Sequence, residues 1–136
     1  WFLGEPVSVS SSFTSVTGKP VEDNAVSVLT YENGAVGVSE TGFVSRFGNY
    51  LVEVCGTEGA VRVTEKEAFW ISVETQGQWV SASLPEAPDL PIKRWIDWVQ
   101  KGIPAPEFGI EEAVRLTKLM EAAYKASETG RTVHLS

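Results

Sequence analysis

The feature that most constrains the fold is a regular alternation, over residues 7–83, between β-branched or aromatic runs and short turn signals. A period of two places successive side chains on opposite faces of a strand, so the pattern predicts antiparallel strands joined by hairpins. Asn33-Gly34 lies between two such runs and favours the positive φ of a tight hairpin turn. Seven strands are expected, over 7–16, 25–31, 35–44, 50–55, 60–64, 69–74 and 79–83.

After residue 84 the pattern changes to a proline-rich connection and then to two segments with helical spacing. The first helix is expected from Pro91, capped by Asp89, to a stop at Gly102. Its apolar face, which we expect to be buried, comprises Ile92, Trp95, Ile96 and Val99. Trp98 is interpreted as a core residue too.

The second helix is predicted over about 110–127, with Leu116 on its buried face and acidic residues in its first turn. Gly130 ends it, and residues 131–135 are expected to form a last strand.

Hairpins followed by helices predict an α+β fold, with a mainly antiparallel sheet of about six to eight strands and helices packed on one face. The 136 residues are enough for one domain, and we expect a single domain over 1–136. With helices on one side only, an apolar sheet face would stay open to water. This open face predicts a homo-oligomer, a dimer or tetramer.

Composition excludes several classes of partner. The net charge is −7, from 18 acidic and 11 basic residues, and no local Lys/Arg cluster offsets it, so nucleic acid is not expected as a partner. The longest apolar runs are too short to span a membrane, so none is expected. The single cysteine, Cys55, rules out an intramolecular disulfide and indicates a cytoplasmic setting.

Motifs that carry chemistry are missing from the sequence. It contains no Gly-x-Gly-x-x-Gly, no phosphate-loop lysine motif and no His-Glu-x-x-His, so neither a nucleotide nor a metal has a recognisable site. His134, the only histidine, is interpreted as a strand-end residue. Cys55 is interpreted as a small apolar residue of a strand, because no basic residue lies nearby in sequence to activate its thiol. We assign no catalytic, cofactor-binding or metal-binding residue.

One loop departs from the strand pattern without being a tight turn: Ser45-Arg46-Phe47-Gly48-Asn49-Tyr50. It combines a cation, an amide, a hydroxyl and aromatic rings around a glycine, the mixture that a small polar ligand requires. Arg46, Asn49 and Tyr50 are therefore the candidate substrate-binding residues. The alternative is an ordinary hairpin loop with an exposed arginine.

Four stretches carry a resemblance to a known family: Trp1-Phe2-Leu3-Gly4-Glu5-Pro6-Val7, Leu29-Thr30-Tyr31-Glu32-Asn33-Gly34-Ala35, Val52-Glu53-Val54-Cys55-Gly56-Thr57-Glu58-Gly59, and 121–133. Their order and spacing resemble the C-terminal substrate and oligomerisation domain of the glucose–fructose oxidoreductase / inositol dehydrogenase (Gfo/Idh/MocA) family of NAD(P)-dependent oxidoreductases.

This resemblance implies an N-terminal Rossmann domain, absent from these 136 residues, that binds NAD or NADP and supplies the acid–base residues. The chain would then shape the substrate pocket of a dehydrogenase acting on a sugar, polyol or related hydroxylated molecule. It would bind no cofactor and be inactive alone. In inositol-dehydrogenase-like members the loop matching 45–50 lies near the substrate, but the Tyr-Gly-Tyr-Asp pattern of those members is missing here.

A second hypothesis requires no enzyme. The open sheet face and the lack of catalytic motifs are also typical of a stand-alone oligomerisation or binding module. Such a module would pair with a second copy and ignore polyols, sugars and nicotinamides.

Overall fold

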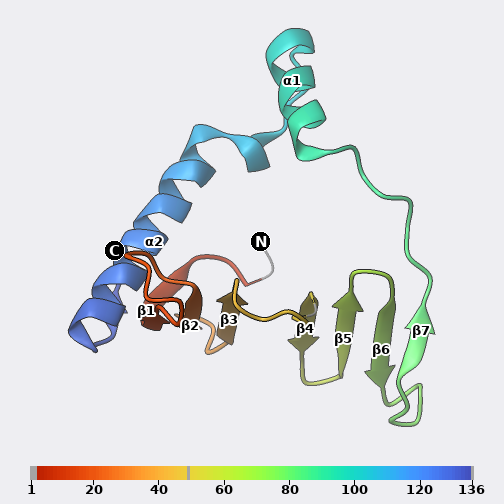
Figure 1. Ribbon diagram of the computed structural model, residues 1–136. Helices are drawn as coiled ribbons and strands as arrows, with labels where there is room; N and C mark the ends of the chain where they lie inside the picture. Colours follow the sequence, from red (N-terminus) through yellow and green to blue (C-terminus); the bar gives the residue numbers. More distant parts are fainter. Residues whose placement is uncertain (1–2, 49, 136) are drawn as a thin grey trace. The chain divides into compact units, whose positions relative to one another are not determined.

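The computed structural model describes residues 3–48 and 50–135. Its elements, in chain order, are β1 (Pro6–Thr14), β2 (Asn24–Tyr31), β3 (Val36–Gly42), β4 (Leu51–Cys55), β5 (Gly59–Thr64), β6 (Ala68–Ser72), β7 (Val80–Ala82), α1 (Pro91–Lys101), the short 3-10 helix η1 (Pro106–Phe108), α2 (Ile110–Thr129) and β8 (Val133–His134) (Figure 1). Contacts divide the chain into two compact units. Unit 1 takes in the described residues of 1–46 and 90–136, and unit 2 is 47–89.

Unit 1 is built on a four-stranded sheet in the order β3-β2-β1-β8, here called sheet A, whose paired strands are antiparallel. The β2–β3 hairpin turns at Asn33-Gly34, as the sequence predicts. Gly34 has a φ of 83°, its N–H donates to the Tyr31 carbonyl at 3.0 Å, and the Asn33 side chain accepts from the Ala35 N–H at 3.0 Å. The hairpin therefore has both the backbone conformation and the side-chain bond that favour this dipeptide in turns.

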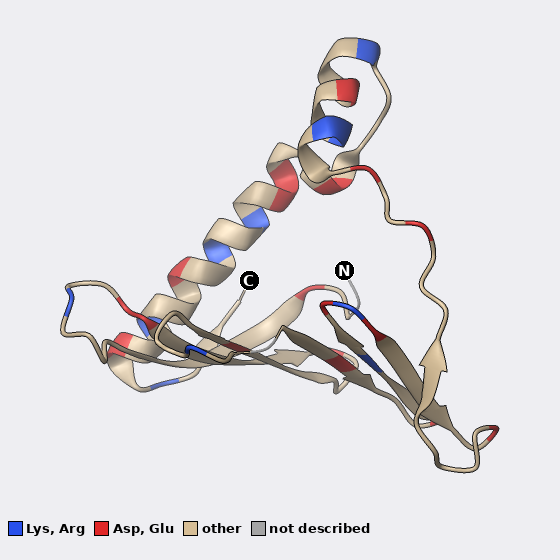
Figure 2. Ribbon diagram, turned by 45° about the vertical axis from the view of Figure 1, so that its right-hand side comes forward, with Lys and Arg blue, Asp and Glu red and all other residues tan. Residues whose placement is uncertain are grey.

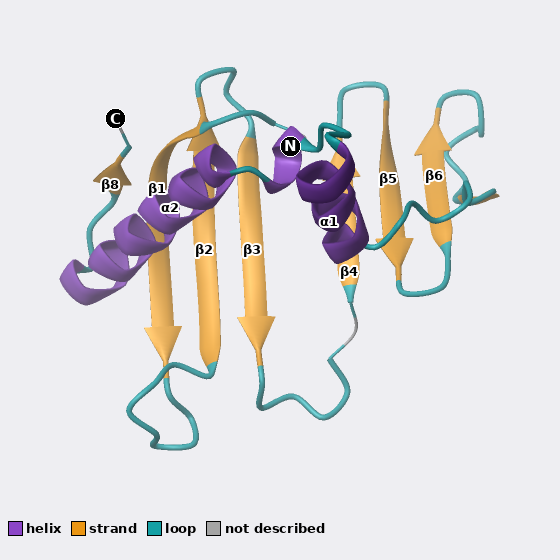
Figure 3. Cartoon of the chain, turned by 90° about the horizontal axis from the view of Figure 1, so that it is seen from above, coloured by secondary structure: helices purple, strands orange, loops and turns teal. Residues whose placement is uncertain are grey.

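Helix α2 lies across sheet A and packs mainly on β1 (Figure 3). The core beneath it holds Val9, which is fully buried, with Ala122 and Ala123 of the helix. Alanines at the contact let the helix backbone approach the sheet closely. Phe13, Leu29, Leu119, Val133 and Leu135 surround this centre. The core of unit 1 is thus small and lies where β1 meets the C-terminal half of α2.

The β1–β2 connection is fixed by one buried carboxylate, Asp23. Its Oδ1 accepts the Val16 N–H at 2.8 Å, and its Oδ2 accepts the Thr17 N–H at 2.9 Å and the Thr17 hydroxyl at 2.6 Å. These bonds, with the Thr17 hydroxyl first, lower the pKa of Asp23. A single side chain therefore replaces the backbone bonds that a tighter turn would make.

Unit 2 is a second four-stranded antiparallel sheet, order β4-β5-β6-β7, here called sheet B. The β4–β5 hairpin closes through the Gly56 N–H, which donates to the Gly59 carbonyl at 2.8 Å. Gly59 begins β5 so close to β6 that a Cβ there would lie 2.2 Å from the Ile71 carbonyl oxygen. Only glycine fits this position without displacing the strand.

The predicted α+β class is confirmed, and the antiparallel strands fall into two sheets of four. The helix bounds agree to within two residues, although Leu90 rather than Asp89 is the N-cap of α1 and no side chain caps that helix. The expected burial of the apolar face of α1 is wrong, because Ile92, Trp95, Ile96 and Val99 are 38–66% exposed and no residue of α1 is buried. The expected burial of Leu116 in α2 is wrong too, since it is 58% exposed. Among the described residues, neither α-helix combines the length and apolarity that crossing a membrane requires.

Candidate functional site

The predicted ligand loop joins β3 to β4, and its described residues belong to no helix or strand. Arg46 and Tyr50 are both exposed, and Asn49 lies outside the described residues. Arg46 belongs to unit 1 and Tyr50 to unit 2. Neither side chain lines the cavities described below. The grouping of Arg46, Asn49 and Tyr50 in one substrate site therefore stays a prediction.

One cavity of unit 1, here called the elbow cavity, has a volume of about 940 Å³. The approach to β1, the η1 turn and the first half of α2 form its walls, with Leu135 at the C-terminal end of the chain. Its apolar lining includes Val7, Phe108, Leu116 and Leu119. Carboxylates line it as well: Glu5, Glu32, Glu107 and Glu112.

Charged side chains that line the elbow cavity form salt bridges. Arg115 bridges Glu112, with Nη1 to Oε1 at 2.6 Å, and Glu5, with Nε to Oε1 at 3.3 Å. Glu107 pairs with Arg94 of α1. Figure 2 shows that both acidic and basic residues lie along α2. Because Glu5, Glu107 and Glu112 already have cationic partners, the geometry suits a contact surface better than an acid–base site.

A second, smaller cavity of about 270 Å³ lies between α2 and strands β1–β3. Phe13, Leu116, Met120 and Tyr124 contribute its apolar wall. The Tyr124 hydroxyl donates to Glu22, and the Tyr124 ring meets Phe13 edge-on, with ring centroids 5.1 Å apart. The shared hydrogen bond raises the pKa of Tyr124 and lowers that of Glu22. A tyrosine held protonated in this way is a hydrogen-bond donor that anchors the β1–β2 connection to α2, not a base.

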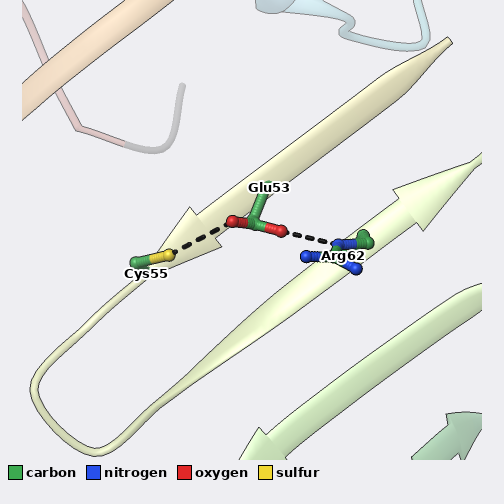
Figure 4. A network of polar contacts seen from close by, with 3 residues as sticks. All are labelled: Glu53, Cys55 and Arg62. Atoms are coloured by element: carbon green, nitrogen blue, oxygen red, sulfur yellow. Dashed lines mark hydrogen bonds and ion pairs between the residues drawn. The ribbon is translucent and has the colours of Figure 1, made fainter. Parts of the chain in front are cut away.

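Sheet B carries a polar network on one face (Figure 4). Arg62 of β5 donates from Nε to Glu53 of β4 at 2.6 Å, and its guanidinium stacks 4.5 Å from the Trp79 ring centroid. Cys55 is exposed, with its Sγ 3.7 Å from Glu53. The interpretation of Cys55 as an apolar strand residue therefore needs correction, since its thiol faces a carboxylate and not a core.

Sequence reasoning missed this network and the elbow cavity. The period-two pattern places Glu53 and Cys55 on one face of β4, but only the register pairs Glu53 with Arg62. The lining of the elbow cavity comes from the two ends of the chain and from the segment 107–119, which no local pattern connects.

The described residues offer no dinucleotide or metal cradle. Their strands pair only in antiparallel fashion, so they do not form the parallel βαβ unit that holds a dinucleotide. Among these same residues no three His, Cys, Asp or Glu side chains cluster as metal ligands would. The described residues therefore do not form the cradle that holds the pyrophosphate of a dinucleotide in a parallel βαβ unit.

Comparison with known families matches the N-terminal part of the chain. Residues 1–62 match the family model described as the GFO/IDH/MocA C-terminal domain. For three of its four stretches, those at 1–7, 29–35 and 52–59, the resemblance inferred from the sequence is confirmed by this match, and the stretch at 121–133 lies outside it. No curated protein matches the chain.

Solved structures share the fold over nearly the whole chain. A protein from Thermotoga maritima has a TM-score of 0.83 at 16% identity, covering 96% of this chain and 41% of its own. An oxidoreductase from Agrobacterium radiobacter, solved with NAD+, L-tartaric acid and magnesium, has a TM-score of 0.76 at 20% identity, covering 97% and 44%. The aldose-aldose oxidoreductase of Caulobacter crescentus, solved with glycerol, has a TM-score of 0.78 at 20% identity, covering 96% and 42%.

These solved chains are more than twice as long as the part that this chain matches. This chain thus spans 41–44% of the length of these three solved chains.

Proposed function

We propose that this chain is the C-terminal domain of an NAD(P)-dependent oxidoreductase that acts on a sugar, a polyol or a related hydroxylated small molecule. In the parent protein the domain shapes the substrate pocket and the oligomer interface, and a preceding Rossmann domain binds the cofactor. The observation that carries the proposal is the match of residues 1–62 to the GFO/IDH/MocA C-terminal domain, at the N-terminal end of a fold shared with oxidoreductases.

The reaction chemistry indicates which part of the parent protein each domain supplies. The nicotinamide supplies the hydride transfer, and the protein supplies binding, orientation and a base. Because the described residues of this chain form no dinucleotide cradle, the cofactor is assigned to the preceding domain and the fragment alone is expected to be inactive. The cytoplasmic setting inferred from the single cysteine is part of the same proposal.

Its first test is to read the coding sequence that precedes Trp1 and to express the full reading frame. A preceding βαβ unit with a Gly-rich turn, and binding of NADH or NADPH by the expressed protein, would support the proposal. A start codon directly before Trp1 would overturn it. The alternative would then be a free-standing oligomerisation module.

The substrate role of the β3–β4 loop is tested with Arg46→Ala in the parent enzyme. Arg46 would hold a substrate hydroxyl or carboxylate, so we expect kcat/KM to fall by more than about tenfold, which corresponds to about 1.4 kcal/mol. Arg131→Ala is the matched control, because Arg131 is an exposed cation in the turn after α2. Equal kinetics for the two variants would remove Arg46 from the site.

A further inference from the structure

The turn of the β2–β3 hairpin contains a dipeptide that is prone to a backbone reaction. Of the three asparagines in the sequence, Asn24, Asn33 and Asn49, only Asn33 is followed by glycine. An asparagine side chain loses its amide when the backbone nitrogen of the next residue attacks Cγ. A following glycine hinders that attack least, because it has no Cβ. Asn33 and Gly34 are both exposed, so water and hydroxide reach the two reacting groups.

A hydrogen bond fixes the Asn33 side chain in the turn. Its Oδ1 accepts from the Ala35 N–H at 3.0 Å. The ring of atoms that this bond closes contains both reacting atoms, Asn33 Cγ and Gly34 N. The Ala35 N–H also donates to the oxygen that gains negative charge when Cγ is attacked, as a backbone donor does in an oxyanion hole. The bond to Ala35 therefore favours the attack.

The space around Gly34 is open. Gly34 has a φ of 83°, and a Cβ built on it would lie more than 4 Å from every atom outside its chain neighbours. The nitrogen of Gly34 can therefore move toward Asn33 Cγ without meeting another segment.

Two backbone hydrogen bonds oppose the reaction. The Gly34 N–H donates to the Tyr31 carbonyl at 3.0 Å, and the Tyr31 N–H donates to the Ala35 carbonyl at 3.1 Å. Attack requires that the Gly34 nitrogen lose its proton to hydroxide, and a proton bonded to a carbonyl exchanges only when that bond opens. All four groups belong to the hairpin itself. Opening of the turn is therefore the step that exposes the nucleophile.

We propose that Asn33 is a site of spontaneous deamidation, and that opening of the β2–β3 turn sets its rate. The Gly34 nitrogen forms a bond to Asn33 Cγ, and the bond from Cγ to the side-chain nitrogen breaks. The proton that Gly34 loses returns through water to the leaving nitrogen, which departs as ammonia. Water then adds to one of the two carbonyl carbons of the resulting succinimide and opens the ring. The product is an aspartate or an isoaspartate at position 33, and no oxidant or reductant takes part.

The modification changes the turn on which the register of β3 depends. Either product adds a negative charge beside Glu32, and isoaspartate also adds a methylene to the backbone. Strand β3 lies at the edge of sheet A, and its pairing with β2 begins next to the turn at Thr30↔Val36. We therefore expect the amides of residues 36–42 to exchange faster in the isoaspartate form. This inference does not depend on which reaction the parent protein catalyses.

The test is peptide mapping by mass spectrometry on the protein expressed from its full reading frame. The protein is incubated at about pH 8 in buffer and, in parallel, in urea that unfolds it. We expect Asn33 to convert at least about tenfold faster in urea than in buffer, because unfolding removes both backbone bonds of the turn. In urea Asn33 should also convert at least about tenfold faster than Asn24, which precedes an alanine.

Two matched variants identify the reacting side chain. Asn33→Gln keeps an amide but lengthens the side chain, so the five-membered ring cannot form and the conversion should disappear. Asn24→Gln makes the same change in β2 and should leave the conversion of Asn33 unchanged.

Three results would contradict the proposal. Equal rates for Asn33 in buffer and in urea would show that the closed turn does not control the reaction. Conversion of Asn33 no faster than that of Asn24 in urea would remove the site. An undiminished mass change in the turn peptide of Asn33→Gln would assign the reaction to another residue.

Discussion

The Asp23 side chain stabilises the β1–β2 connection, because its carboxylate accepts three hydrogen bonds from Val16 and Thr17. Residues 15–23 make up the β1–β2 connection, and this buried side chain is its main organiser. A neighbouring contact joins the same region to α2, since Glu22 accepts from Tyr124. Two adjacent acidic residues therefore have different partners, one within the loop and one on the helix.

Asp23→Asn should destabilise unit 1 at neutral pH, because an amide replaces the charged acceptor of three hydrogen bonds. The folded pKa of Asp23 is lower than its unfolded value, so its contribution is fully present above the unfolded pKa and is lost as the pH falls through the folded pKa. Urea unfolding at about pH 7 and about pH 3 should show a large wild-type loss of stability on acidification and a smaller one in the variant.

Glu58→Gln is the control for this experiment, because Glu58 is an exposed acid in the β4–β5 turn of unit 2. Equal acid sensitivity in wild type and Asp23→Asn would show that the carboxylate does not organise the loop.

At the scale of elements, α2 and α1 use amphipathic faces differently. Helix α2 buries Ala122, Ala123 and Ala126, all in its C-terminal half. Its N-terminal half faces the two cavities, and α1 has no buried residue. Helical spacing identifies an apolar face in both cases, but only packing shows which part of the face is covered.

Leu119→Ala and Leu116→Ala test this difference within one helix. Leu119 packs against the core, so its truncation should cost about 2 kcal/mol of the free energy of unfolding. Leu116 is 58% exposed, so its truncation should cost less than about 1 kcal/mol. Helix propensity changes equally in the two variants, which makes each the control for the other. Chemical denaturation measures both, and similar losses would contradict the burial described here.

At the scale of the molecule, sheet A has one face under α2 and one face open. The open face places Val28 opposite Val38, and Val26 and Val36 lie on the same side of the sheet. These four valines are 37–68% exposed, beside serines and threonines of β1 and β2. Exposed apolar patches of this kind often mark an interface between proteins.

We therefore expect the chain to self-associate through the open face of sheet A. Val38→Glu should shift the protein toward monomer, because it places a charge among the exposed valines of this face. Val73→Glu is the control, since Val73 is exposed after β6 in unit 2. Sedimentation velocity over a range of concentrations measures the effect. A monomeric wild type, or an equal effect of both variants, would speak against this interface.

Sequence alone predicted the element order and most bounds, because strands, hairpin turns and helix ends depend on residues a few positions apart. Asn33-Gly34 and Gly130 illustrate this, since each adopts the positive φ or the turn that its type favours. The candidate site was less predictable. Arg46, Asn49 and Tyr50 were chosen by residue type alone. Their grouping in one site stays a prediction, because it depends on contacts between segments that no local pattern specifies.

What the sequence by itself determined is therefore the α+β class, the hairpins and the two amphipathic helices, since hydrophobic periodicity is a local property of the chain. Tertiary structure decided the rest: the division of the strands into two sheets, the pairing of Glu53 with Arg62, and the exposure of Trp95 and Leu116. The physical reason is that burial and strand register depend on which distant segments meet, and the same apolar face can be covered or left open.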